Sequence, residues 1–161
     1  MILRRPSQTD KEAILEMMAE FEREQSAHDG GFWNPDNFVY EDIQAEAGLN
    51  IPENWVPAIQ LVSFDEADYA LGFLNLRLRL NDYLLEKGGH IGYSIRPSER
   101  GKGYAKESLR QGLQVAKDKN IHRALVTCSI KNPTSRAVIL ANGGQLEDIR
   151  HETERYWIDL E

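Results

Sequence analysis

Apolar residues recur along the chain at two spacings, one typical of helices and one typical of strands. A helical spacing occurs between residues 9 and 24, and its apolar face consists of Ile14, Met17, Met18 and Phe21. Thr9 and Glu12 precede this face with the spacing of a capping box, so we expect the helix to begin at about residue 9. A second helix is predicted from about 38 to 47. The turn-rich loop between them carries Phe32 and Trp33, which either pack on the core or line a binding site.

Strict alternation of apolar and polar residues predicts that Leu74 to Leu80 form a strand with one buried face and one polar face. Residues 81–89 are expected to be a connector. Shorter apolar runs predict further strands at 2–5, 58–64, 90–96, 121–128, 145–150 and 155–160. Helices are predicted at 103–119 and from Pro133 to Ala141, where Asn132 is the N-cap.

This order of elements predicts a single α/β (α+β) domain over residues 1–161, with about seven strands and about four helices. The strand, helix and strand between residues 90 and 128 favour a parallel pairing of those two strands. No internal repeat or low-complexity segment suggests a second domain.

Composition excludes several classes of protein. A single cysteine, Cys128, rules out an intrachain disulfide and a cysteine-based zinc site, and its apolar surroundings predict a small buried residue. The start of the chain does not resemble a signal peptide, and no apolar stretch is long enough to span a membrane, so we expect a cytoplasmic protein. The net charge of −7 argues against a nucleic-acid partner.

The charge is unevenly distributed along the chain. Residues 10–68 contain fifteen acids but only Lys11 and Arg23, a balance of −13, whereas the remaining residues carry +6. Two interpretations remain open. The acidic segment faces a cationic ligand, or its carboxylates simply keep the surface helices solvated.

A glycine-spaced basic turn joins the strand at 90–96 to the helix at 103–119. Gly101 and Gly103 let main-chain N–H groups approach a ligand, and the start of the helix adds unpaired donors and a positive dipole. Residues 96–106 carry a net charge of about +3 within an acidic protein. This pattern predicts a phosphate-binding cradle, the alternative being an exposed basic turn without a ligand.

The turn resembles the pyrophosphate signature of the GNAT superfamily, the acetyl-CoA-dependent N-acetyltransferases. The signature reads Gln or Arg, two residues, Gly, one residue, Gly or Ala, and here it is Arg100-Gly101-Lys102-Gly103-Tyr104-Ala105. An apolar strand ending at Pro97 precedes it, and Lys131 to Ser135 open a second helix about 30 residues downstream, as in that family. The resemblance implies a mixed, mostly antiparallel sheet, splayed at the strand that binds the cofactor.

The resemblance also implies how acetyl-CoA would bind as co-substrate, without a metal ion. Main-chain N–H groups from Arg100 to Lys106 would hold the pyrophosphate, and nearby basic side chains would reach the phosphates. The strand end at Ile95 and Arg96 would pair with the pantetheine arm, and an N–H group near Ile95 would polarise the thioester carbonyl. Asn132 and Ser135 would contact the far arm. The complete set is Ile95, Arg96, Arg100, Gly101, Lys102, Gly103, Tyr104, Ala105, Lys106, Asn132 and Ser135.

The sequence departs from the family at the general acid. The tyrosine that often stands seven residues after the N-cap asparagine is replaced by Ile139. Tyr156 or Tyr93 could take its place. Deprotonation of the acceptor amine needs a base that titrates near neutrality, for which His90 is the first candidate and Glu86 the second.

The predicted function is therefore transfer of an acetyl group from acetyl-CoA to a primary amine of a small molecule or peptide, by direct attack. A cationic acceptor is favoured if the acidic segment lines its pocket, and the resemblance allows a homodimer. The alternative is a non-catalytic acyl-CoA-binding protein of the same fold. A dinucleotide-dependent oxidoreductase fits poorly, because the glycine turn comes late and is not a G-x-G-x-x-G motif.

Overall fold

The computed structural model of the chain describes residues 1–29 and 36–161, so Phe32 and Trp33 lie outside the described residues. Within these ranges, seven strands form two antiparallel sheets with the orders β1-β2-β3-β4 and β5-β7-β6. The strands are β1 (Ile2–Arg4), β2 (Ala58–Phe64), β3 (Ala70–Arg77), β4 (Ile91–Ile95), β5 (Arg123–Ser129), β6 (Gln145–Arg150) and β7 (Thr153–Asp159). The helices are α1 (Lys11–Arg23), α2 (Phe38–Ala47), α3 (Asp82–Glu86), α4 (Tyr104–Asp118) and α5 (Pro133–Ala141), and short 3₁₀ turns span Gln8–Asp10 and Pro97–Glu99.

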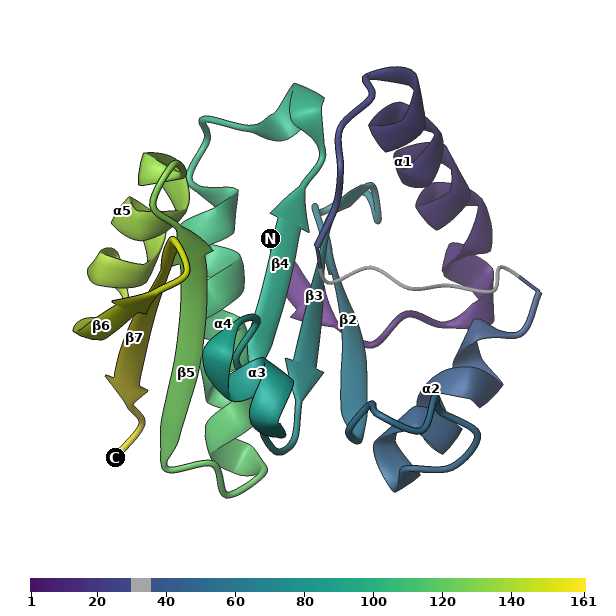
Figure 1. Cartoon of the computed structure of the whole chain (residues 1–161). Coiled ribbons are helices and arrows are strands. Elements are labelled where there is room, and N and C mark those ends of the chain that lie inside the picture. Colours follow the sequence, from purple (N-terminus) through teal and green to yellow (C-terminus); the bar gives the residue numbers. More distant parts are fainter. Residues whose placement is uncertain (30–35) are drawn as a thin grey trace.

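The predicted fold class and the order of the strands and main helices are confirmed (Figure 1). None of the helices in the described ranges is both long and apolar enough to cross a membrane.

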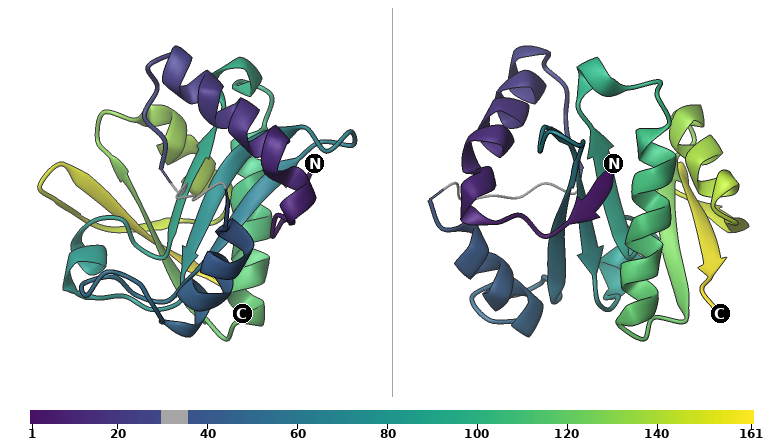
Figure 2. Two further views of the ribbon diagram at one scale, coloured as in Figure 1. Left: turned by 90° about the vertical axis from the view of Figure 1, so that its right-hand side faces the viewer. Right: turned by 180° about the vertical axis from the view of Figure 1, so that it is seen from behind.

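Helices cover both faces of the four-stranded sheet (Figures 1 and 2). On one face, Phe21 of α1 and Phe38 of α2 join an apolar cluster with Phe73 of β3. On the other face, Leu109 of α4 joins a larger cluster that includes Leu74 of β3 and extends to the second sheet. Residues 70–74 of β3 are buried on both faces. From Leu74 to Arg77 the predicted alternation is present, with Asn75 and Arg77 partly exposed, but the strand ends at Arg77 and not at Leu80. Alternation in a sequence cannot show that a helix covers the second face.

Among the described residues, main-chain hydrogen bonding between the two sheets is confined to the residue before β4 and the first half of β5. The His90 N–H group donates to the Leu125 carbonyl at 2.8 Å, and the Leu125 N–H group donates to His90 Nδ1 at 2.9 Å. Figure 1 shows the two strands side by side and pointing the same way, but no further main-chain hydrogen bond joins them among the described residues. The predicted parallel pairing is thus limited to one end, and the strands separate toward the amino-terminal ends of α4 and α5.

Two local predictions about helix starts are wrong. The connector predicted at 81–89 contains α3, whose N-cap Asn81 accepts a hydrogen bond from the Leu84 N–H group at 2.9 Å. The predicted Thr9–Glu12 capping box does not form. Instead the Asp10 carboxylate accepts from the Ser7 N–H group at 2.8 Å.

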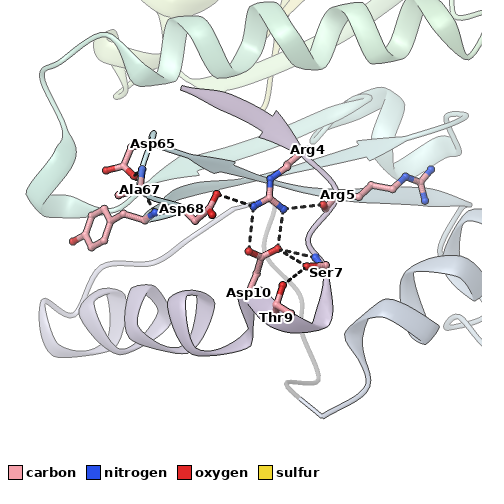
Figure 3. A network of polar contacts seen from close by, with 9 residues as sticks. Arg4, Arg5, Ser7, Thr9, Asp10, Asp65, Ala67 and Asp68 are labelled. Atoms are coloured by element: carbon pink, nitrogen blue, oxygen red, sulfur yellow. Dashed lines mark hydrogen bonds and ion pairs between the residues drawn. The ribbon is translucent and has the colours of Figure 1, made fainter.

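Arg4 of β1 pairs with Asp10, which explains why Asp10 and not Glu12 takes part in the cap (Figure 3). Its guanidinium donates to both carboxylate oxygens of Asp10, at 2.8 and 3.1 Å, and lowers the pKa of that group. The same guanidinium contacts Asp68 in the β2–β3 turn at 3.4 Å. The Arg4 guanidinium therefore connects β1 to the start of α1 and to the β2–β3 turn. A capping rule based on neighbouring residues does not predict these contacts.

Candidate functional site

The glycine turn after β4 is an open cradle of main-chain N–H groups. Gly101 and Gly103 have φ angles of +78° and +84°, values that glycine adopts at little cost. In the described part of the chain, no hydrogen bond uses the N–H groups of residues 101–106. A Cβ atom added at Gly101 or Gly103 would meet no atom within 4 Å. The donors at the start of α4 are therefore free and have space in front of them for an anion.

Arg96 does not face this cradle, contrary to the expectation that its side chain reaches a phosphate. Its guanidinium is only 1% exposed and forms ion pairs with Glu20 at 2.8 Å and with Glu16. It also donates to the Ala70 carbonyl at 3.0 Å. Glu20 in turn accepts from the Ser98 N–H group at 2.9 Å. The Arg96 side chain thus fastens the end of β4 and the beginning of the turn to α1.

The other three cations of the turn lie at its surface. Arg100 donates through Nε to the Ile95 carbonyl and through Nη2 to the Ser26 hydroxyl, both at 2.9 Å. Lys102 pairs with Glu99 at 2.7 Å, and Lys106 is exposed without an ion pair to any described residue. Arg100 therefore covers the last carbonyl of β4, whereas the two lysines stand where an anion on the cradle can attract them.

The N-terminus of α5 faces β4 across the gap between the strands. Asn132 caps this helix, as predicted, by accepting from the Ser135 N–H group at 3.1 Å. The Ser135 hydroxyl lies 2.8 Å from the Tyr93 hydroxyl of β4. Burial raises the pKa of Tyr93 to about 12, so its hydroxyl remains protonated at neutral pH. A hydrogen bond between the protonated Tyr93 hydroxyl and the Ser135 hydroxyl thus bridges the two sides of the gap.

His90 lies where β4 and β5 meet, and its environment does not favour the predicted role of general base. Only 7% of its surface is exposed, and burial together with the charge of Arg77 lowers its pKa to about 4. Its Nδ1 atom already accepts from the Leu125 N–H group. The second candidate, Glu86 on α3, forms an ion pair with Arg150 at 2.7 Å.

Tyr156 lies in the core of the second sheet, which disfavours it as a general acid. The residue is 3% exposed, and its hydroxyl donates to Glu154 at 3.0 Å. Burial and the Glu154 carboxylate raise its pKa, and Glu154 is also bound by Arg136 at 2.8 Å. Cys128 is buried beside the same carboxylate, as its apolar surroundings predicted.

Part of the acidic segment contributes to the fold. Four cations from outside residues 10–68 pair with at least four of its fifteen acids, in pairs that include Arg4–Asp10, Arg5–Asp42, Arg5–Glu46, Lys119–Glu46 and Arg96–Glu20. The uneven distribution of charge along the sequence therefore partly reflects ion pairs between residues 10–68 and the rest of the chain. No group of three or more His, Cys, Asp or Glu side chains in the described ranges could hold a metal ion.

The Glu20 carboxylate should make stability sensitive to acid. Burial alone raises its pKa, but hydrogen bonds from Arg96 and Ser98 outweigh burial and lower the pKa from 4.5 to about 2. A lowered pKa stabilises the fold above pH 4.5, and this contribution is lost as the pH falls toward 2. We therefore expect the stability difference between wild type and Glu20→Gln to shrink over that interval in urea unfolding. Parallel pH dependences would contradict the assignment.

The family model of the acetyltransferase (GNAT) domain matches residues 1–145. No curated protein matches the chain significantly. Among solved structures, ribosomal-protein-S5-alanine acetyltransferase from Vibrio fischeri superimposes with a TM-score of 0.68 at 16% identity, covering 96% of this chain and 89% of its own. A mutant form of spermidine N-acetyltransferase SpeG from Vibrio cholerae gives 0.65 at 16%, covering 99% and 95%.

The Salmonella typhimurium protein yncA, solved with its cofactor acetyl-CoA, also gives a TM-score of 0.65 at 16% identity, covering 99% of this chain and 94% of its own. At such low identities these likenesses show a shared fold.

Proposed function

The chain belongs to the GNAT acetyltransferase family, and from this premise we propose that it acetylates a primary amine of a small molecule or peptide. Acetyl-CoA is the co-substrate. The observation that carries the proposal is the open cradle of N–H groups at residues 101–106, which suits the pyrophosphate of coenzyme A. A cytoplasmic location, expected from the sequence, is part of the proposal.

Different residues around the cradle would bind different parts of acetyl-CoA. The N–H groups of residues 101–106 would hold the pyrophosphate, with Lys102 and Lys106 adding charge, whereas the Arg100 N–H group already donates to the Pro97 carbonyl at 3.4 Å. The main chain at Ile95 and Arg96 would receive the pantetheine arm, which requires Arg100 to release the Ile95 carbonyl. Asn132 and Ser135 at the start of α5 would contact the arm from the other side of the gap.

When bound, acetyl-CoA supplies an activated acyl group with a thiolate as leaving group. The chain itself has no suitable nucleophile for an acyl-enzyme at its one cysteine, because burial and Glu154 raise the pKa of Cys128 to about 12. This favours direct attack by the neutral amine, whose ammonium form first releases one proton to solvent. An N–H group near Ile95 would stabilise the negative charge that develops on the carbonyl oxygen.

Tyr93 is the better placed of the two tyrosines for assisting the leaving thiolate. Its hydroxyl lies at the gap, against Ser135, whereas that of Tyr156 is held by Glu154. Because the pKa of Tyr93 is about 12, the group acts as a hydrogen-bond donor and keeps its proton in the resting enzyme. Ile139, at the position of the usual tyrosine, is fully buried.

Tyr93→Phe should therefore lower kcat by about tenfold or more, since a positioned proton or hydrogen-bond donor contributes at least that much to catalysis. Affinity for acetyl-CoA, measured by titration calorimetry, should stay within about twofold. The matched variant Tyr156→Phe removes the same hydroxyl from the core and should leave kcat nearly unchanged. Equal kcat values for both variants would remove Tyr93 from the mechanism.

Thiol release from acetyl-CoA in the presence of an amine panel tests the proposed function. The panel contains spermidine, propane-1,3-diamine, benzylamine and a peptide with an N-terminal alanine, which together sample small polyamines, a simple amine and a peptide. We expect turnover with at least one of them. Tight binding of acetyl-CoA without release under any acceptor would instead support a non-catalytic acyl-CoA-binding protein.

A further inference from the structure

Two consecutive residues attach the loop that follows α1 to the sheet, His28 to β3 and Asp29 to β4. The ring of His28 lies 5.3 Å from the ring of Phe21 and 5.4 Å from that of Phe73, measured between centroids. The N–H group of Asp29 donates to the Ser94 hydroxyl, which donates to the Asp29 carbonyl at 2.8 Å. An aromatic contact and a pair of hydrogen bonds thus hold Asp29 against the strand.

The Asp29 carboxylate rests directly on Gly92 of β4. A Cβ atom at residue 92 would lie 2.6 Å from Oδ1 and 3.0 Å from Oδ2 of Asp29. Atoms this close would clash, so any larger residue at this position would push the carboxylate away from the strand. The absence of a side chain at Gly92 is what lets a negative charge approach the main chain of β4.

This carboxylate lies on the opposite face of β4 from the proposed leaving-group donor. Successive residues of a strand point to opposite faces, so Gly92 and Ser94 share one face while Tyr93 points to the other. Tyr93 reaches α5, and Asp29 lies over Gly92 on the side of α1. An acceptor amine bound at Asp29 would therefore approach β4 from the face opposite the Tyr93 hydroxyl.

The Asp29 carboxylate is also only weakly neutralised by the protein. It is 68% exposed, and its ion pair with a described residue is to Arg77 Nη2, 3.7 Å from Oδ1 and beyond hydrogen-bond distance. Arg77 directs its Nη1 atom to the Gly88 carbonyl at 3.1 Å. Other acids of the segment, such as Asp10 and Glu20, are buried in close ion pairs.

We infer that Asp29 binds the ammonium group of the acceptor, and that the acceptor is accordingly an aliphatic amine that is cationic at neutral pH. This inference rests on the proposed acetyltransferase function and adds the residue that selects the substrate. A hydrogen bond between an ammonium and a carboxylate orients the nitrogen on the acceptor side of β4. Asp29 acts here as a binding and positioning residue.

The test compares steady-state kinetics of four variants with every amine of the panel that wild type acetylates. Asp29→Asn should raise KM for the amine about tenfold or more, as expected for loss of a charged hydrogen bond, with kcat within about threefold. Gly92→Ala should reproduce the increase by displacing the carboxylate, and Asp29→Glu should restore part of the affinity. Glu12→Gln neutralises an exposed acid of α1 and is the control, for which KM should not change.

Each outcome is decisive. No turnover by wild type with any amine overturns the proposed function and this inference together. Turnover by wild type with an unchanged KM in Asp29→Asn overturns the inference alone. A calorimetric loss of acetyl-CoA affinity in Asp29→Asn that accounts for the whole defect would also overturn it, because the carboxylate would then act on the cofactor side.

Discussion

Gly103→Val is expected to abolish measurable acetyl-CoA binding while the protein remains folded. Residue 103 has a φ angle of +84°, and a side chain there would project into the empty space in front of the free N–H groups. Two charged hydrogen bonds lost to the phosphates would weaken binding by about 100-fold or more. Titration calorimetry with acetyl-CoA measures this loss directly.

The chain provides a matched control for the strain at this position. Gly143, after α5, has a φ angle of +88°, and an added Cβ would likewise meet no atom within 4 Å. Gly143→Val therefore carries the same backbone cost of about 1–2 kcal/mol without filling the cradle. Both variants should lose similar stability, but only Gly103→Val should lose acetyl-CoA. Wild-type affinity in Gly103→Val would refute the placement of the pyrophosphate.

Arg96→Met should have the largest effect on stability, reducing the free energy of unfolding by about 3–5 kcal/mol. The guanidinium is 1% exposed, and its removal leaves the Glu20 carboxylate, 6% exposed, without its principal counter-charge. The Ala70 carbonyl also loses a hydrogen bond. Urea unfolding monitored by far-UV circular dichroism gives the value.

Two further variants separate this effect from the loss of any surface charge. Arg110→Met breaks an ion pair with Glu107 in which the side chains are 62% and 38% exposed, and it should cost less than about 1 kcal/mol. The double variant Arg96→Met with Glu20→Gln removes both buried charges and should be less destabilised than the sum of the single changes. A loss in Arg96→Met no larger than that in Arg110→Met would show that the pair is not structural.

Most elements could be predicted because their signals are local. The apolar face of α1, the proline and asparagine at the start of α5, and the hairpins are set by residues close in sequence. The exceptions have non-local causes. Asp10 takes part in the first cap because Arg4 of β1 pairs with it, and the first half of β3 is buried on both faces because α1 packs on one of them.

The candidate site likewise has some features set by neighbouring residues and others set by distant ones. The positive φ angles of Gly101 and Gly103 and the start of α4 depend on a few adjacent residues, so the sequence alone was enough to predict an amide cradle. The side chains around it could not be assigned from their types. Arg96, His90 and Tyr156 have the chemistry for phosphate binding or proton transfer, but contacts with distant segments bury all three.

The sequence by itself determined the family, the order of elements and the glycine turn, since each is carried by neighbouring residues and their main-chain preferences. Only the tertiary structure decided which charges remain available to a ligand, because burial and ion pairing depend on residues far apart in the chain. It placed Arg96 among the carboxylates of α1, brought Tyr93 to Ser135, and left the carboxylate of Asp29 exposed over Gly92.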